Sequence, residues 1–255
     1  MRSKNFKVRL LIGFAIVAFA FVKRCNSKEI NEFTGREQTI NMSSDQEIAI
    51  GLDNREVMAQ QHGGLHTNST YQSLVDEVGN ELINNSIAKD TPYKYEFHLL
   101  ADEKTINAFA LPGGQIFITY ALFSKLENKD QLAGVLGHEI GHVLGRHSAE
   151  RIAESDFWQT VTTGATVGVD MGGLVGGIGQ QTLLKNGRGD ELESDDLGVL
   201  FMINSGYNPE EMIGVMEILK AAAGPNRVPE FQSSHPDPDN RIEKIQESIE
   251  KYKNQ

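Results

Sequence analysis

Two histidines four residues apart enclose a glutamate in the run His138-Glu139-Ile140-Gly141-His142. Apolar residues around this run recur at helical spacing, which predicts a helix with both imidazoles on one face. Such a pair can hold one zinc ion, and the glutamate between them can take a proton from a zinc-bound water. This is the chemistry of a metallopeptidase, with His138 and His142 as metal ligands and Glu139 as the catalytic base. Short motifs of this kind also arise by chance on ordinary helices, so a third ligand is needed.

The third zinc ligand distinguishes the classes of zinc peptidase. A metzincin needs a histidine six residues after His142, but Ser148 stands there and His147 falls one position short. A later segment offers Glu191, with Asp195 four residues further on the same helical face. Glu191 would complete a site of two histidines and one glutamate, and Asp195 would accept the outer N–H of a zinc histidine. The alternative is that this acidic segment is the solvated start of a helix.

The chain resembles the HtpX and CAAX-prenyl-protease group of zinc metallopeptidases, gluzincins that include the mitochondrial overlapping-activity protease. The likeness extends from about Ser43 to Ile249 and is closest to the exported, single-domain members. Asp196 departs from the pattern, because the group commonly has a basic residue there. Four stretches carry the resemblance: Asn107 to Ile118, the HExxH run, Glu191 to Asp195 with Gly198, and His235-Pro236 with Arg241 and the upstream Gly206-Tyr207-Asn208-Pro209.

The resemblance implies an α+β fold, a mostly helical zincin-like domain with a small antiparallel sheet next to the HExxH helix. It also offers His235 and Arg241 as catalytic residues that stabilise the oxyanion formed during peptide hydrolysis. Two alternatives stay open. His235 can occupy the open zinc position and switch the enzyme off, and Arg241 can serve only as an ion-pair partner of Asp237 or Glu191.

A hairpin is predicted just before the active-site helix. Asn107 to Leu111 and Gln115 to Thr119 read as its strands, joined by Pro112-Gly113-Gly114. An edge strand beside a catalytic helix can bind an extended peptide as a further strand, although the hairpin can also be plain scaffold. The residues assigned to substrate binding are Asn107, Ala108, Phe109 and Ala110.

Composition limits the classes of protein that fit. The 255 residues are 39% apolar, which suits one globular domain with a sizeable core. A net charge of −11 disfavours nucleic acid as a partner. The single cysteine, Cys25, excludes an internal disulfide framework and a cysteine-based zinc site.

The N-terminus predicts export. Residues 1–27 read as a signal sequence or short membrane anchor, because a basic start precedes the apolar run Leu10 to Val22, which is shorter than the roughly 20 residues of a spanning helix. Cys25 offers lipidation as an alternative, but Lys23 and Arg24 stand where small residues are expected. Residues 28–42 read as a linker and residues 43–255 as the zinc metallopeptidase domain.

Two further segments have recognisable patterns. Ser44 and Glu47 have the spacing of a capping box at the start of a helix that runs to Gln61. Thr160 to Gly179 is rich in glycine and small apolar residues and is expected to be a mobile or closely packed segment that covers the cleft.

The resulting hypothesis is a zinc-dependent endopeptidase with one zinc ion per chain. Its expected substrates are unfolded or misfolded polypeptides among exported or membrane-associated proteins, in protein quality control. The expected location is the periplasm or the cell-envelope membrane, with membrane association through the N-terminus and no nucleic acid partner. The alternative is a chaperone-like factor that binds substrates and has low or latent proteolytic activity.

Overall fold

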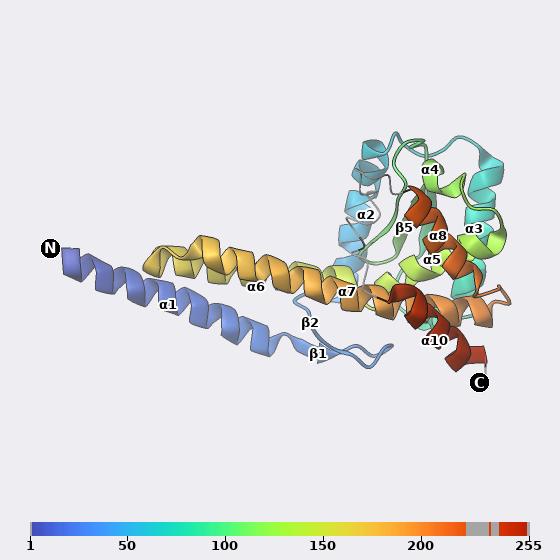
Figure 1. The fold of residues 1–255 in the computed structure, drawn as a ribbon. Helices are drawn as coiled ribbons and strands as arrows, with labels where there is room; N and C mark the ends of the chain where they lie inside the picture. Colours follow the sequence, from blue (N-terminus) through green and yellow to red (C-terminus); the bar gives the residue numbers. More distant parts are fainter. Residues whose placement is uncertain (1, 223–234, 236–239, 254–255) are drawn as a thin grey trace. The chain divides into compact units, whose positions relative to one another are not determined.

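The computed structural model describes residues 2–222, 235 and 240–253, without the side chains of 2–5 and 184–186. These residues form two compact units: Met1–Met42 with Ser148–Gly187, and Ser43–His147 with Arg188–Gln255. Most elements are helices, as expected for a mostly helical α+β chain (Figure 1).

The sheet of the second unit has the strand order β3-β5-β4. β4 (Ala108–Leu111) and β5 (Gln115–Thr119) form the predicted antiparallel hairpin. β3 (Glu96–Leu100) pairs with β5 in parallel, because the two chain reversals on either side of β4 restore the direction of β3. The sheet is therefore mixed. β5 is wholly buried at its centre, and within the described part of the chain β4 is an outer strand.

Helices cover this sheet. Ala59 of α2 (Ser44–Gln61) packs into a cluster with Leu100 and Phe117 of the strands. α5 (Lys129–Leu144), which carries the HExxH run, contacts β4 and β5. It also packs against helices α3 and α8, so every residue from Gln131 to Leu144 is buried. The remaining elements of this unit are α3 (Ser69–Asn84), η1 (Ile87–Asp90), α4 (Tyr120–Phe123), α8 (Glu211–Ala222), α10 (Arg241–Lys253) and the later part of α7 (Gly172–Asn204).

Side-chain caps determine where the helices begin. The capping box of α2 pairs Ser43 with Gln46, one residue earlier than the predicted pair, since glutamine serves at the third helical position as well as glutamate does. The side chain of Asn128 accepts a hydrogen bond from the backbone N–H of Gln131 at 2.8 Å and caps α5.

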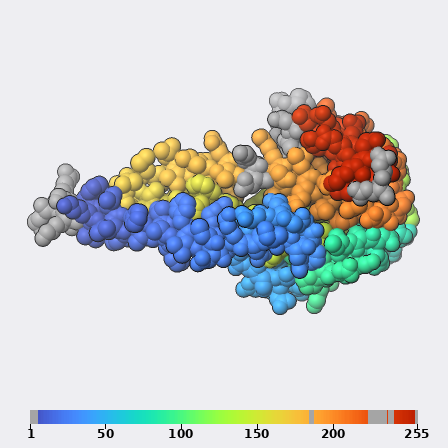
Figure 2. All heavy atoms as spheres, turned by 90° about the horizontal axis from the view of Figure 1, so that it is seen from below, coloured from blue at the N-terminus to red at the C-terminus, as the bar shows by residue number. Residues whose placement is uncertain are grey.

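The first unit consists of α1 (Arg2–Asn26), strands β1 (Lys28–Ile30) and β2 (Glu37–Thr39), α6 (His147–Val169) and the start of α7. α1 lies alongside α6 in two perpendicular views (Figures 1 and 2). The helices approach closely at glycines: a β-carbon on Gly13 would lie 2.6 Å from the carbonyl oxygen of Gly164. The first part of the glycine-rich segment, in α6, therefore packs closely on α1, because the missing side chains permit this contact.

The segment predicted as a linker contains two short strands. β1 and β2 pair as a short antiparallel hairpin. The Arg36 guanidinium and the Gln38 amide both donate to the carboxylate of Glu150 in α6, at 2.7 and 3.2 Å. Polar hydrogen bonds hold this hairpin, which is why its composition resembled a linker. No helix in the described part of the chain combines the length and apolarity needed to cross a membrane.

Candidate metal centre

The two histidines of the HExxH run point at each other from one face of α5. Their Nε2 atoms are 3.0 Å apart, and His138 and His142 are 4% and 9% exposed. The four-residue spacing places the rings one turn apart, as predicted. Two nearly buried ring nitrogens therefore share one small volume inside the protein.

Close packing of α5 against α7 brings the distant carboxylate to this pair. A β-carbon on Gly137 would lie 3.3 Å from the Cα of Gly198. One turn further along, a β-carbon on Gly141 would lie 2.9 Å from the Cα of Ser194. Glycine at these positions lets the helix backbones almost touch. Glu191, which is fully buried, then lies 3.3 Å from His138 Nε2 through Oε2 and 3.4 Å from His142 Nε2 through Oε1.

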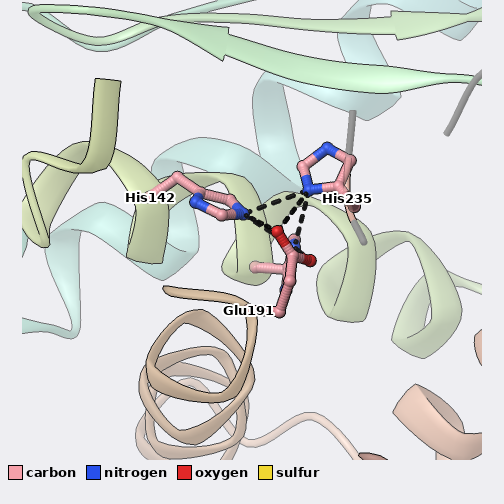
Figure 3. Close-up of side chains that lie close together, drawn as sticks. His142, Glu191 and His235 are labelled. Carbon is pink, nitrogen blue, oxygen red and sulfur yellow. Dashed lines mark hydrogen bonds and ion pairs between the residues drawn. The ribbon is translucent and has the colours of Figure 1, made fainter. Parts of the chain in front are cut away.

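His235 adds a fourth donor (Figure 3). Its Nδ1 lies 3.4 Å from His138 Nε2, 3.2 Å from His142 Nε2 and 3.1 Å from Glu191 Oε1. Four ligands around zinc at about 2.0–2.1 Å stand about 3.3–3.4 Å from one another at the corners of a tetrahedron. The observed spacings are close to this, so His138, His142, Glu191 and His235 can together hold one metal ion.

Hydrogen bonding and charge in the cluster fit a cation. Within the described part of the chain, Glu191 Oε2 is a buried oxygen without a hydrogen-bond partner, which a metal would supply. Burial alone would raise the pKa of Glu191, but His235 and His142 beside it hold that pKa well below its usual value. Burial also lowers the pKa of His142. A neutral imidazole and an ionised carboxylate are the states that a metal requires.

A carboxylate contacts the ring nitrogen of His138 that faces away from the cluster. His138 Nδ1 lies 2.8 Å from Asp195 Oδ1, the contact that the sequence predicted for Asp195. Burial opposes protonation of His138, but the carboxylates of Asp195 and Glu191 beside its ring outweigh burial and raise the pKa of His138 to about 9. Binding a metal at Nε2 would therefore release a proton from this ring.

Arg241 lies behind the histidine pair, on the Asp195 side. Its Nε and Nη2 donate to the two oxygens of Asp195 at 2.7 and 2.9 Å, and Nη2 is 3.5 Å from Glu191 Oε2. Arg241 is 5% exposed. This bidentate pair fixes Asp195 and hence the ring of His138. Asp237, the partner considered from the sequence, lies outside the described residues.

Glu139 faces the cluster without a hydrogen bond. Within the described residues, both carboxylate oxygens are buried and lack a hydrogen-bond partner, and Oε1 is 3.5 Å from His235 Nε2. Burial raises the pKa of Glu139 above its usual value, although His235 and His138 act in the opposite direction. A buried carboxylate beside a metal site is placed to accept a proton and to return it.

The predicted substrate-binding residues lie on β4, next to the cluster. The Ala108 carbonyl oxygen is 3.3 Å from His235 Nε2. Asn107 is turned toward β5, because its carbonyl accepts from the backbone N–H of Thr119. The ring of Phe109 packs inward on Phe117, with centroids 4.9 Å apart. In an antiparallel pair the backbone groups alternate in direction, so Ala108 and Ala110 direct theirs away from β5.

The sequence did not assign His147, which lies directly behind His142. The two Nδ1 atoms are 2.8 Å apart, and His147 Nε2 is 2.9 Å from Glu193 Oε2. The spacing of the residues excluded His147 as a metal ligand. It gives no information on whether His147 contacts a metal ligand. The only signal in the sequence was the presence of a third histidine soon after the run.

Comparison with known proteins gives one family and several relatives. The pattern of Peptidase family M48 matches residues 69–249. A beta-barrel assembly-enhancing protease of Yersinia pestis is 31% identical over 79% of this chain and 43% of its own length. The mitochondrial metalloendopeptidase OMA1 of Schizosaccharomyces pombe is 34% identical over 60% of this chain and 46% of its own length. The chain thus spans less than half the length of these relatives.

Proposed function

We propose, from the premise that this chain belongs to peptidase family M48, that it is an endopeptidase with one zinc ion per chain. Family membership confirms the metallopeptidase resemblance of the sequence. The observation that carries the proposal is the convergence of His138, His142 and Glu191 beside the unbonded carboxylate of Glu139. A purely structural zinc site would have no use for that carboxylate.

The residues divide the chemistry among them. Zinc held by His138, His142 and Glu191 would supply a Lewis acid that activates water and polarises the scissile carbonyl. Glu139 takes the proton of the attacking water on a carboxylate oxygen and returns it to the leaving amine. The carboxylate oxygens of Glu139 are buried beside the cluster and make no hydrogen bond within the described residues, so they are free to take part in both transfers.

The outer strand β4 supplies substrate affinity. The outward backbone groups of Ala108 and Ala110 can pair with an extended peptide, which would then lie beside the metal cluster. Main-chain pairing recognises any extended segment, so it selects for unfolded chains more than for a sequence. Unfolded or misfolded polypeptides are therefore the proposed substrates.

His235 holds the described conformation in a resting state. Its Nδ1 takes the fourth corner of the ligand set, where the water has to bind, and its Nε2 approaches the outward carbonyl of Ala108. One ring thus blocks both the water position and the substrate edge. Catalysis requires His235 to leave, after which the same ring is available to stabilise the oxyanion. Arg241 instead pairs with Asp195 and so helps to fix the ring of His138.

A second candidate function is a chaperone-like factor that binds exposed strands and rarely cuts. With His235 at the fourth position a bound metal would have no place for water, whereas peptide binding along β4 requires only that His235 leave the Ala108 carbonyl. The proposed setting for both functions is quality control of exported or membrane-associated proteins. The basic and apolar N-terminus supports a periplasmic or cell-envelope location, with membrane association through that segment.

The test of the proposal is metal analysis together with hydrolysis. We expect about one zinc per chain by mass spectrometry of the metal, cleavage of casein and of a peptide library, and loss of both cleavages with a chelator. Readdition of zinc should restore them. Casein binding without zinc-dependent cleavage would favour the chaperone-like function, and the absence of bound metal would refute the enzyme.

A further inference from the structure

A hydrogen-bonded chain runs from the buried metal cluster to a partly buried acidic residue of α7. His142 Nδ1 is 2.8 Å from His147 Nδ1, and His147 Nε2 is 2.9 Å from Glu193 Oε2. His147 is 2% exposed and also lies 3.3 Å from Ser194 Oγ. His142 therefore makes its rear contact with a second imidazole, whereas His138 makes its rear contact directly with Asp195.

The donor and the acceptor in each hydrogen bond of this chain follow from the role of His142 Nε2. Its Nε2 faces the other three donors, so a metal there leaves the proton of the neutral ring on Nδ1. The Nδ1–H must donate to His147 Nδ1, which has to be an acceptor. His147 then carries its own proton on Nε2 and donates it to Glu193. Each ring has one tautomer that satisfies both neighbours.

The backbone at the end of α5 is arranged to hold His147 in this place. A β-carbon on Gly145 would lie 2.3 Å from His147 Nε2, so the ring folds over a position that only glycine leaves open. Arg146 has φ 56°, in the left-handed region that a side chain rarely adopts. Its Nε and Nη2 are fixed by the buried carboxylate of Glu47 at 2.8 and 2.6 Å. Such backbone strain persists where surrounding contacts hold it.

We propose that His147, backed by Glu193, is a positioning residue that fixes the orientation and tautomer of the metal ligand His142. The inference rests on the proposed function, because it takes His142 Nε2 to be a metal ligand. An acceptor behind a ligating histidine makes the ring a better donor and removes its rotational freedom. The two histidines of the HExxH run are therefore supported in different ways, one by a carboxylate and one by a neutral imidazole.

A competing use of the same residues is a second cation site. Glu193, Asp190 and His147 present three possible ligand atoms to one another, with Asp190 Oδ1 3.8 Å from His147 Nε2. The hydrogen-bond distance between His147 and Glu193 favours a proton between them. The number of metal ions per chain distinguishes the two uses.

The experiment measures zinc affinity in the full chain by competition with a chelator, and the visible spectrum of the cobalt-substituted protein. His147→Leu removes the acceptor, whereas the side-chain oxygen of His147→Asn can replace Nδ1. We expect the leucine variant to bind zinc about 10–100-fold more weakly and the asparagine variant to stay within about threefold of wild type. The cobalt spectrum should change only in the leucine variant. His66→Leu, in the loop before α3, is the matched control.

Three results would overturn the inference. His147→Leu could bind zinc as tightly as wild type, or the two variants could be equally weak, which would mean that packing matters and the acceptor does not. Two zinc ions per wild-type chain, falling to one in Glu193→Ala, would make His147 a ligand of a second ion. A wild-type chain that binds no zinc refutes the proposed function, whereas zinc binding that is indifferent to His147 refutes this inference alone. The melting temperature of each metal-free variant reports any loss of folding.

Discussion

Gly141 of α5 lies against Ser194 of α7 so closely that an added β-carbon would come within 2.9 Å of the Ser194 Cα. This contact sets the distance between the two helices that carry the metal donors. We expect Gly141→Ala to separate them, to cost about 1–3 kcal/mol of stability and to weaken zinc binding. Thermal unfolding and zinc titration measure both effects. Gly189→Ala is the control, because its added methyl group, also on α7, meets open space. Unchanged zinc affinity in Gly141→Ala would show that the spacing is not critical.

Glu139→Gln separates metal binding from proton transfer. The amide keeps the size of the side chain but cannot take the proton of the attacking water. We expect zinc content to stay at the wild-type level and casein hydrolysis to fall about 10²–10⁴-fold. Metal analysis and a fluorescent casein assay measure these quantities, with the exposed Glu96→Gln as control. Full activity in Glu139→Gln would remove the proposed base, and a wild type no more active than this variant would favour the chaperone-like function.

Glu191→Ala removes the ligand that α7 contributes. Mutating a residue that hydrogen-bonds to a metal ligand typically weakens metal binding about 10–100-fold. Loss of the ligand itself should therefore weaken zinc binding by more than about 100-fold. Competition with a chelator gives the dissociation constant. The exposed Glu217→Ala, on α8, should bind zinc normally. One zinc per chain retained at wild-type affinity in Glu191→Ala would point to a different ligand set.

His235→Ala discriminates between two roles of this ring. Its removal should leave the other three ligands in place and free the fourth position for water. Because more of the protein is then in the state that can cleave, we expect the rate of peptide hydrolysis to rise about two- to tenfold. A residue needed chiefly to stabilise the oxyanion would instead lower the rate by about 10²–10³-fold. Steady-state cleavage of a quenched peptide gives the sign of the change, and a fall of that size would refute the resting-state blockade.

Asp102 links stability to pH at the end of β3. Its carboxylate accepts hydrogen bonds from the backbone N–H groups of Lys104 and Thr105, at 2.8 and 2.9 Å, and contacts His62 Nδ1 at 3.0 Å. Burial acts to raise the pKa of Asp102, but these hydrogen bonds outweigh it and hold the pKa below its ordinary 3.8. The folded state therefore favours the carboxylate, and this stabilisation is present above pH 3.8 and is lost as the pH falls below it.

The corresponding variant is Asp102→Ala. We expect it to lower the melting temperature at pH 7, with the difference from wild type narrowing below about pH 4. Thermal unfolding from pH 7 to pH 3 measures this, and Asp90→Ala serves as a control at the end of η1. A difference that stayed constant across this range would mean that Asp102 contributes by packing alone.

The sequence by itself determined the elements with local signals. Spacing within one helix predicted the paired imidazoles of His138 and His142, because a helix fixes which residues share a face. Local turn chemistry predicted the β4–β5 hairpin. The parallel pairing of β3 and the ordered hairpin at residues 28–42 depend on contacts between distant segments, and the sequence did not predict them.

Only the tertiary structure decided what surrounds each ligand. Helices packed at glycines and the left-handed backbone of Arg146 bring His147 to His142. Arg241 reaches Asp195 in the same folded arrangement. A histidine at a given spacing has no fixed partner until the chain folds back on it. Local periodicity predicts which side of a helix a group faces, whereas the long-range packing of α5 against α7 decides which residues it contacts there.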